Sequence, residues 1–454
     1  FFGLYALQHR GQESAGIATA DGDRIRLHSA MGLVGQAFRE DDLERLTGHI
    51  AIGHTRYSTT GSSHIYNAQP ILSRGPDIEL ALGHNGNVIN AVELKSELAE
   101  WGCNFSSSTD SEIIAHLLSN APAKTWPERA NYGMRRLQGA YSLVILTKDS
   151  LIGMRDPLGV RPLCLGKLNG GWVIASESCA LDHIGADYLR EIEPGETVII
   201  NGDGIKSTLW KGTDSRKALC IFEFIYFSRP DSILDDKLIY TVRMAMGAQL
   251  AREHPVDADL VIGVPDSATA AAVGYSQESD IPFGEGLLKN RYVGRTFIEP
   301  DQRLRELGVR LKFNPLREVL EGKRVVVVDD SIVRGTTTPR VVSLVKKAGA
   351  QEVHLRICAP PIISPCYFGV DMATKKELIA ANNTVPEIRE FLGADSLGYL
   401  SVQGLLKATG LPPDNFCTAC FTGKYPIPVQ LKLGLDKLYL ENQPEQQHTS
   451  YYIT

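Results

Sequence analysis

The pattern of apolar and polar positions along the chain changes near residue 214. Up to about residue 213, short segments rich in β-branched and aromatic residues are separated by glycines, with helical stretches such as residues 91–100 between them. This pattern predicts an α+β domain of layered antiparallel sheets with helices. From about residue 215, continuous apolar strands alternate with loops and helices, which is typical of a parallel sheet covered on both faces. We therefore predict two domains, residues 1–214 and 215–454.

Two strand–loop–helix units stand out in the second half. Residues 259–264 lead through a Pro-Asp-Ser turn into an alanine-rich helix, and residues 324–328 lead through residues 329–335 into another helix. The carboxyl ends of parallel strands meet at one edge of a sheet, where open α/β sheets bind their ligands. We expect the functional groups of this half to lie at that edge.

The segment 323–338, KRVVVVDDSIVRGTTT, has the composition of a phosphate and sugar site. The N-terminus of a helix offers unpaired N–H groups to a phosphate, and Gly335 would let the backbone approach it closely. Asp329 and Asp330 could bind sugar hydroxyls or a magnesium ion, which prefers carboxylate oxygens. A capped helix behind two exposed carboxylates is the alternative. The hydroxyls that could add hydrogen bonds to a phosphate belong to Ser331, Thr336 and Thr337.

The run VVVVDDSIVRGTT resembles the phosphoribosyl pyrophosphate motif of type I phosphoribosyltransferases. The resemblance implies that Asp329 and Asp330 bind the ribose hydroxyls and that residues 331–337, Arg334 among them, surround the 5-phosphate. The turn at Asp266 and Ser267 resembles the loop that meets the pyrophosphate, although such a turn alone is common. The implied magnesium contacts are Ser267, Asp329 and Asp330.

Residues 289–297, KNRYVGRTF, lie between these two units. Beside a pyrophosphate site they resemble a flexible lid that closes over the substrate and excludes water. A solvated basic loop is the alternative. The implied lid contacts are Lys289, Arg291, Tyr292 and Arg295.

The first half contains four short islands: LQHRGQESAGIA, GHTRYSTTG, GHNGN and SSSTDSE. Together they resemble the class II, N-terminal-nucleophile glutamine amidotransferase domain. That resemblance implies that Asn85 and the N–H of Gly86 form an oxyanion hole, while Arg56 binds the carboxylate of glutamine and Asp110 its ammonium group. Taken singly, these residues could form a surface ion pair (Arg56), a hairpin turn (Asn85 and Gly86) and a helix cap (Asp110).

In this family the nucleophile is a cysteine at the mature N-terminus, with its own amino group as the base. The chain begins with Phe1, and Cys103, Cys164 and Cys179 occupy the wrong positions to replace that cysteine. We therefore expect a chain that lacks its N-terminal nucleophile segment and depends on free ammonia.

Eight cysteines in 454 residues are too few for a disulfide scaffold. Cys417 and Cys420 form a CxxC pair, and with Cys220 and Cys366 they would supply four ligands for zinc or a 4Fe-4S cluster. Spacing does not choose between these metals, and free buried thiols are a third possibility. The contexts resemble the cluster-bearing branch of glutamine phosphoribosylpyrophosphate amidotransferases, which implies 4Fe-4S. We expect the remaining cysteines to be core or incidental residues: Cys103, Cys164, Cys179 and Cys358.

Composition narrows the classes of partner. Lys and Arg number 47 against 53 Asp and Glu, a net charge of -6, and no stretch concentrates basic residues, so we expect no nucleic-acid partner. The longest apolar runs are strand-length, far short of the roughly 20 residues of a membrane-spanning helix. Because the first residues contain no secretion-signal pattern, we expect a cytoplasmic protein.

The combined resemblance implies one reaction: glutamine, phosphoribosyl pyrophosphate and water give 5-phosphoribosylamine, glutamate and pyrophosphate, the first step of de novo purine synthesis. It also implies a homotetramer inhibited by purine nucleotides. A regulator that senses phosphoribosyl pyrophosphate through a non-catalytic phosphoribosyltransferase fold is the main alternative. A salvage phosphoribosyltransferase would not need the first half, and other class II amidotransferases would not need the motif at Asp329.

Overall fold

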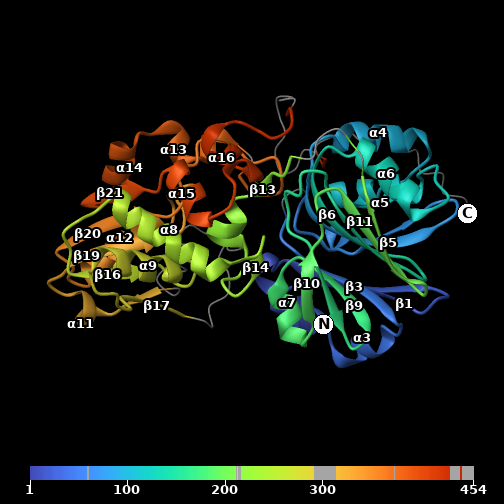
Figure 1. Cartoon of the computed structure of the whole chain (residues 1–454), viewed down its shortest axis with the longest axis horizontal. Helices are drawn as coiled ribbons and strands as arrows, with labels where there is room; N and C mark the ends of the chain where they lie inside the picture. The colour runs from blue at the N-terminus through green and yellow to red at the C-terminus, as the bar shows by residue number, and fades with distance from the viewer. Residues whose placement is uncertain are drawn as a thin grey trace, which may run out of the picture. The chain divides into compact units, whose positions relative to one another are not determined.

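The computed structural model describes residues 1–58, 61–210, 212, 216–290, 313–372, 374–429 and 440–441. The chain forms two compact units (Figure 1). The first contains Phe1–Lys217, Cys366–Ala373 and Ile427–Thr454, and the second contains Ala218–Pro365 and Thr374–Pro426. Among the described residues, no helix combines the length and the apolar character needed to cross a membrane.

Antiparallel sheets form the centre of the first unit. The largest has six strands in the order β12 (Gly204–Leu209), β11 (Glu196–Asn201), β7 (Leu151–Arg155), β6 (Gly139–Leu146), β5 (Glu79–Val88) and β4 (Ile71–Arg74). A three-stranded sheet has the order β2 (Ile25–Met31), β1 (Ser14–Ala20) and β3 (Ile50–Arg56). Another has the order β10 (Asp187–Glu191), β8 (Cys164–Leu168) and β9 (Gly171–Ala175).

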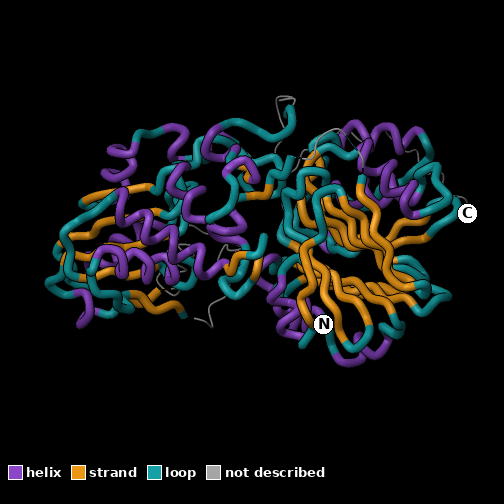
Figure 2. The backbone as a smooth tube through the Cα atoms, in the orientation of Figure 1, coloured by secondary structure: helices purple, strands orange, loops and turns teal. Residues whose placement is uncertain are grey.

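Small side chains allow two of these sheets to pack face to face. All seven residues of β1 are buried, and Ala18 and Ile52 pack with Ala81 and Leu146 in one apolar cluster. Figure 2 shows the strands of these sheets in two layers. The prediction of layered antiparallel sheets with helices is confirmed.

Three helices pack with the six-stranded sheet in a second apolar cluster. They are α4 (Ala91–Glu100), α5 (Asp110–Ser119) and α6 (Trp126–Arg136), so the helix expected over residues 91–100 is present. Shorter helices complete the unit: α1 (Phe2–Ala6), α2 (Val34–Ala37), α3 (Glu40–Arg45) and α7 (Ser178–Ile184), with single turns η1 (Gln8–Arg10) and η2 (Ile65–Asn67).

A parallel sheet lies at the centre of the second unit, as the apolar runs predict. Its order is β16 (Leu260–Gly263), β19 (Arg324–Asp329), β20 (Glu352–Ile357) and β21 (Ser396–Tyr399), all pairs being parallel. The valines of β19 are fully buried. Two-stranded pairs surround it: β13 (Leu219–Cys220) with β22 (Phe416–Cys417), β14 (Ile233–Leu234) with β15 (Lys237–Leu238), and β17 (Leu287–Lys289) with β18 (Phe313–Pro315).

Helices α8 (Ile239–Glu253) and α9 (Thr269–Ser279) pack closely against each other. A Cβ on Gly247 would lie 1.8 Å from the carbonyl oxygen of Ala271, and one on Gly274 would lie 2.0 Å from that of Met244. The two glycines therefore set the helix separation. The other helices of the unit are α11 (Arg317–Leu320), α12 (Thr338–Lys347), α13 (Ile379–Asn382), α14 (Val385–Leu392), α15 (Val402–Thr409) and α16 (Ala419–Thr422), with the π-helix η3 (Glu223–Phe227) and the single turns η5 (Lys375–Glu377) and η6 (Pro413–Asn415).

Candidate active site

Arg56 is the last residue of β3 and is only 3% exposed. Its Nη1 donates to the carbonyl of Ser62 at 3.1 Å and lies 3.5 Å from Oε2 of Glu13. Burial lowers the pKa of the guanidinium, and the charges of Glu13, Asp110 and Glu441 oppose that change. A surface ion pair, the alternative for Arg56, is therefore wrong, since this cation is buried among carboxylates.

Asn85 and Gly86 lie within β5, opposite Ser142 and Tyr141 of β6, so the hairpin-turn alternative is wrong. The Nδ2 atom of Asn85 is buried without a hydrogen-bond partner among the described residues. A buried donor left unpaired costs about 1–3 kcal/mol, which is a reason to look for a ligand oxygen there. Gly86 has φ +148°, and a Cβ on it would lie 2.0 Å from the carbonyl oxygen of Ala140. Only glycine fits this position.

Asp110 is the first residue of α5 and is 4% exposed. Thr109 occupies the N-cap, and the Asp110 carboxylate instead accepts a hydrogen bond from the N–H of Val88, Oδ2 to N 2.9 Å. It also lies 3.8 Å from Nδ1 of His84. Asp110 thus connects α5 to the end of the strand that contains Asn85, which is not what a simple helix cap would do.

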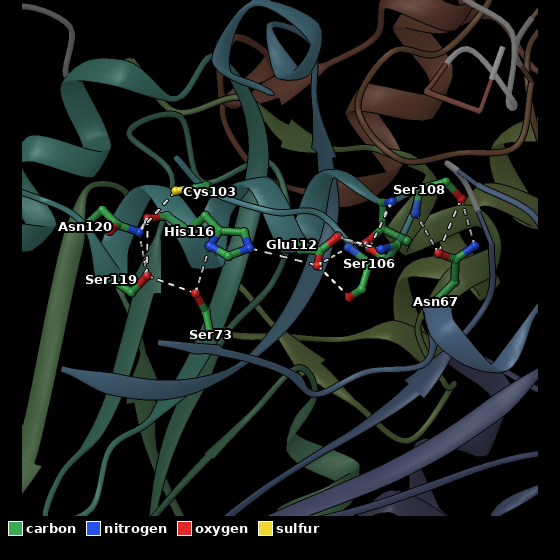
Figure 3. A network of polar contacts seen from close by, with 11 residues as sticks. Asn67, Ser73, Cys103, Ser106, Ser108, Glu112, His116, Ser119 and Asn120 are labelled. Carbon is green, nitrogen blue, oxygen red and sulfur yellow. Dashed lines mark hydrogen bonds and ion pairs between the residues drawn. The ribbon is translucent and has the colours of Figure 1, made fainter. Parts of the chain in front are cut away.

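A polar network fixes the loop that precedes Asp110 (Figure 3). The carboxylate of Glu112 accepts hydrogen bonds from the N–H and hydroxyl of Ser106, both at 2.8 Å. It also accepts from the N–H and hydroxyl of Ser107, at 2.7 and 2.8 Å. Four hydrogen bonds to one carboxylate thus tie this loop to the first turn of α5. On the other side of Glu112 the network continues to His116, Ser73, Ser119, Asn120 and Cys103.

Asn67 joins the Arg56 side of this region to the Asp110 side. Its side chain is fully buried, and Nδ2 donates to the carbonyl of Ser62 at 2.9 Å, the same carbonyl that Arg56 binds. Nδ2 also lies 3.0 Å from Oγ of Ser108. No sequence signal pointed to Asn67, because nothing in its local context distinguishes it from an ordinary turn residue.

Glu441, near the end of the chain, also reaches this region. Its Oε1 accepts from the N–H of Ser62 and from the hydroxyl of Ser108, both at 2.7 Å. The preceding Leu440 is 4% exposed and packs in the cluster of the helices and the six-stranded sheet. A carboxylate therefore lies where Ser62 and Ser108 meet, next to the Arg56 cation. No sequence motif indicated this.

In the second unit, Asp329 ends β19 and Asp330 follows it, each 8% exposed. Oδ2 of Asp330 accepts from Oγ of Ser267 at 2.5 Å, and Oδ1 accepts from Oγ of Ser331 at 2.5 Å. Burial raises the pKa of the Asp330 carboxyl, and the two serine hydroxyls oppose that change. Because both acids are buried, the alternative of two exposed carboxylates is wrong. The structure also brings the turn at Ser267 to the acidic pair.

Past the acidic pair, Ser331 to Thr337 lead into α12, with Thr337 at the N-cap position. Gly335 has φ +69°, and a Cβ on it would meet Cδ1 of Ile379 at 2.7 Å. Arg334 forms an ion pair with Glu377, Nε to Oε2 2.6 Å. Glycine is thus required at the turn, while the Arg334 side chain is engaged by a carboxylate.

The candidate lid residues are only partly described. Nζ of Lys289 forms an ion pair with Oδ2 of Asp266 at 2.7 Å, so these two predicted site residues are in contact. Arg291, Tyr292 and Arg295 lie outside the described residues.

Three of the four candidate cluster ligands belong to the second unit. Cys220 and Cys417 are direct partners in the parallel pair β13 and β22, and Cys420 lies in α16. The carbonyl of Cys420 accepts from the N–H of Ser364 at 3.0 Å, and Cys366, of the first unit, follows two residues later in the chain. Within the part of the chain that the structure describes, no three His, Cys, Asp or Glu side chains are arranged to hold a metal ion.

The remaining cysteines fit structural roles. Burial raises the pKa of the thiols of Cys103, Cys164 and Cys358, which disfavours the thiolate that a nucleophile requires. Cys179 is buried as well.

Two family models match the two halves of the chain. Residues 54–183 match the glutamine amidotransferase domain, and residues 231–360 match the phosphoribosyl transferase domain. Together with the folds and the two groups of residues above, these matches define a two-domain glutamine amidotransferase with a phosphoribosyltransferase half.

Whole-chain relatives give the family. An amidophosphoribosyltransferase of Synechocystis sp. is 54% identical over 448 residues, covering 97% of this chain and 90% of the relative. One of Methanothermobacter thermautotrophicus is 50% identical over 435 residues, 94% and 91% of the two chains. The chain belongs to the amidophosphoribosyltransferase family, whose reaction is the first step of purine biosynthesis.

Two solved structures agree over the same length. The structure of an allosteric regulatory enzyme of purine biosynthesis has a TM-score of 0.90 and 48% identity, covering 96% of this chain and 94% of its own. A glutamine phosphoribosylpyrophosphate amidotransferase from B. subtilis, complexed with ADP and GMP, has a TM-score of 0.89 and 47% identity, covering 95% of both chains. No finding favours the alternative of a non-catalytic sensor.

Proposed function

We propose that the first domain, residues 1–214, releases ammonia from glutamine and that the second, residues 215–454, adds it to phosphoribosyl pyrophosphate. Nitrogen attacks the anomeric carbon of the sugar as the bond to pyrophosphate breaks. The products are 5-phosphoribosylamine, pyrophosphate and glutamate, and water supplies the oxygen of the new carboxylate. The observation that carries this proposal is the Asn85 amide, unpaired among the described residues, in a domain that also buries Arg56 and Asp110.

In the glutaminase half, Arg56 binds the α-carboxylate of glutamine and Asp110 binds its ammonium group. This double recognition selects the free amino acid over a simple amide. Asn85 Nδ2 and the N–H of Gly86 bind the oxyanion that forms at the side-chain amide. The unsatisfied state of Asn85 among the described residues supports this role, because an incoming oxygen would remove the cost of a buried, unpaired donor. The nucleophile is an N-terminal cysteine, as in class II enzymes generally.

In the phosphoribosyltransferase half, Asp329 and Asp330 bind the ribose hydroxyls, and residues 331–337 with the start of α12 bind the 5-phosphate. Lys289 and Asp266 lie at the pyrophosphate side, with Arg291, Tyr292 and Arg295 as lid contacts. The hard oxygen donors of Ser267, Asp329 and Asp330 suit magnesium, which needs few protein ligands when it also binds phosphates. Magnesium would neutralise charge on the departing pyrophosphate.

Four thiols, Cys220, Cys366, Cys417 and Cys420, are proposed as ligands of a 4Fe-4S cluster. The pairing of Cys220 with Cys417, and the position of Cys420 three residues after Cys417, support this role for the three thiols of the second unit. All four donors are soft sulfurs, as such a cluster requires. The cluster would be structural and take no part in a step of the reaction.

The assembly and its control are proposed by analogy. We propose a cytoplasmic homotetramer that purine nucleotides inhibit; the ADP and GMP in the B. subtilis relative support nucleotide binding. Control by purine nucleotides would match flux into the pathway to its products.

The test is magnesium-dependent pyrophosphate release from phosphoribosyl pyrophosphate, with ammonium as the nitrogen source. Asp330→Asn should lower the rate at least about a hundredfold, since it removes a charged contact to the ribose. The matched control is Asp280→Asn, the same change at an exposed position of the same unit. Equal rates for wild type and Asp330→Asn would exclude the proposed ribose site.

A further inference from the structure

A short segment of the chain belongs to the first unit although its neighbours on both sides belong to the second. The segment is Cys366–Ala373, preceded by Pro365 and followed by Thr374; we call it the strap. The N–H of Cys366 donates to the carbonyl of Met372 at 2.9 Å, which closes the strap into a loop. Phe368 and Met372 are each 2% exposed, so the strap is anchored by buried side chains.

The strap contacts the strand that bears the proposed oxyanion hole. Nδ2 of Asn87 donates to the carbonyl of Tyr367 at 2.9 Å. Gly369, at φ +96°, packs directly on Gly86: a Cβ on Gly369 would lie 2.9 Å from both the carbonyl carbon and the oxygen of Gly86. Backbone therefore touches backbone at the residue whose N–H is the proposed oxyanion donor.

Two further hydrogen bonds fix the strap to the same domain. Nε of Arg161, a residue that is 2% exposed, donates to the carbonyl of Phe368 at 3.2 Å. The hydroxyl of Tyr57 donates to Oδ2 of Asp371 at 3.4 Å. Tyr57 immediately follows Arg56, the proposed carboxylate ligand. The strap thus contacts both the oxyanion strand and the segment next to the carboxylate site.

We propose that the strap is a positioning element of the glutaminase site, with Gly369 and Asn87 holding the backbone of Gly86 in the orientation that the oxyanion requires. The inference rests on the proposed function, since it assumes that Gly86 donates to the oxyanion. An oxyanion donor acts only over a narrow range of distance, and losing one lowers kcat about a hundredfold to a thousandfold. A displacement of a few tenths of an ångström should therefore reduce kcat without loss of substrate binding.

Gly369→Ala is the direct test, because its Cβ would push against the Gly86 backbone, which cannot rotate away as a side chain can. Gly22→Ala is the matched control: Gly22 has φ +99°, in the same unit, and a Cβ there meets nothing within 4 Å. Both variants place a Cβ at a similar positive φ, and only Gly369→Ala carries the clash. Asn87→Ala removes the hydrogen bond to Tyr367 without any clash.

The assay uses protein that carries the N-terminal cysteine of the proposed function, and it compares glutamine-dependent with ammonia-dependent formation of phosphoribosylamine. For Gly369→Ala we expect kcat with glutamine to fall about tenfold to a hundredfold, with KM for glutamine within about twofold and the ammonia-dependent rate unchanged. Asn87→Ala should show a smaller fall in kcat with glutamine, and Gly22→Ala should have the kcat of the wild type.

The outcomes distinguish a failure of the positioning role from a failure of the proposed glutaminase function. If wild type turns over glutamine and Gly369→Ala keeps its kcat, or loses no more than Gly22→Ala, the positioning role is excluded. A rise in KM at constant kcat would also exclude it, since that would mean a role in binding glutamine. If the wild-type protein with this cysteine does not use glutamine at all, the proposed glutaminase function is excluded, and the positioning role with it.

Discussion

Both polar atoms of the Asn67 side chain bind Ser108. Oδ1 of Asn67 accepts a hydrogen bond from the N–H of Ser108 at 3.0 Å, and Nδ2 of Asn67 donates to Oγ of Ser108, also at 3.0 Å. The two residues are 41 positions apart in the chain. Because the same amide also binds the carbonyl next to Arg56, Asn67 sets the distance between the proposed carboxylate and ammonium ligands of glutamine.

Asn67→Ala should therefore weaken glutamine binding about tenfold, or about 1.4 kcal/mol. The ammonia-dependent rate should be unchanged, since the second unit is untouched. Asn120→Ala makes the same change at the far end of the network of Figure 3 and should leave the glutamine affinity within about twofold. Titration calorimetry with glutamine measures both; equal affinities for the two variants would mean that Asn67 has only a structural role.

Glu441→Gln should strengthen glutamine binding a few-fold. The Glu441 carboxylate accepts hydrogen bonds from Ser62 and Ser108, and its negative charge opposes the lowering of the Arg56 pKa by burial. It therefore competes with the α-carboxylate of glutamine for the same cation. Glu100→Gln, at an exposed position of the same unit, is the control. Weaker binding in Glu441→Gln would instead make Glu441 a supporting part of the pocket.

Ser267→Ala should raise KM for phosphoribosyl pyrophosphate several-fold in the ammonia-dependent assay. The change removes one of the two hydroxyls that hold the Asp330 carboxylate, so the acid loses part of its fixed orientation. Ser276→Ala, at a serine of α9 that donates to the carbonyl of Ile281 instead, is the control. If Ser267→Ala leaves the KM for phosphoribosyl pyrophosphate unchanged, the turn at Ser267 does not contribute to the ribose site.

The buried His54 should make the first unit sensitive to acid. Burial lowers its pKa from 6.5 to about 3, and Nε2 lies 3.0 Å from the carbonyl of His84, the residue before Asn85. Between these pH values the unfolded chain binds a proton that the folded chain does not, so stability falls as pH drops below about 6.5. The loss is about 1.4 kcal/mol per pH unit at most.

His54→Gln keeps a donor for that carbonyl and removes the proton uptake. Urea unfolding between pH 4.5 and 8 should show a shallower loss of stability toward acid for the variant than for wild type. Parallel curves would mean that His54 binds its proton with the same pKa in the folded and the unfolded chain.

The local sequence predicted those parts of the site that lie within single strand–loop–helix units. The four valines before Asp329 form a buried inner strand of the parallel sheet, paired with β16 on one edge and β20 on the other, and the following glycine and threonines lead into α12. The GHNGN motif indicated Asn85 and Gly86 as candidate site residues. It did not predict that they lie in a strand, because an Asn-Gly pair more commonly forms a turn.

Contacts between distant residues could not be predicted in this way. Glu441 is 379 residues from Ser62, and Asn87 is 280 residues from Tyr367. Glu441 lies outside every motif of the sequence, and the GHNGN island that ends at Asn87 does not indicate a partner so far along the chain.

The sequence by itself determined the two folds, the acidic pair and the identity of the proposed glutamine-recognising residues, because periodicity and short motifs act over a few neighbouring positions. The tertiary structure alone decided how these residues are held: Asn67 between two loops, Glu112 under the Asp110 loop, Glu441 beside Arg56, and the strap on Gly86. Such contacts form only when the packed core brings distant backbone together, and hydrogen bonds there depend on distances that no local pattern encodes.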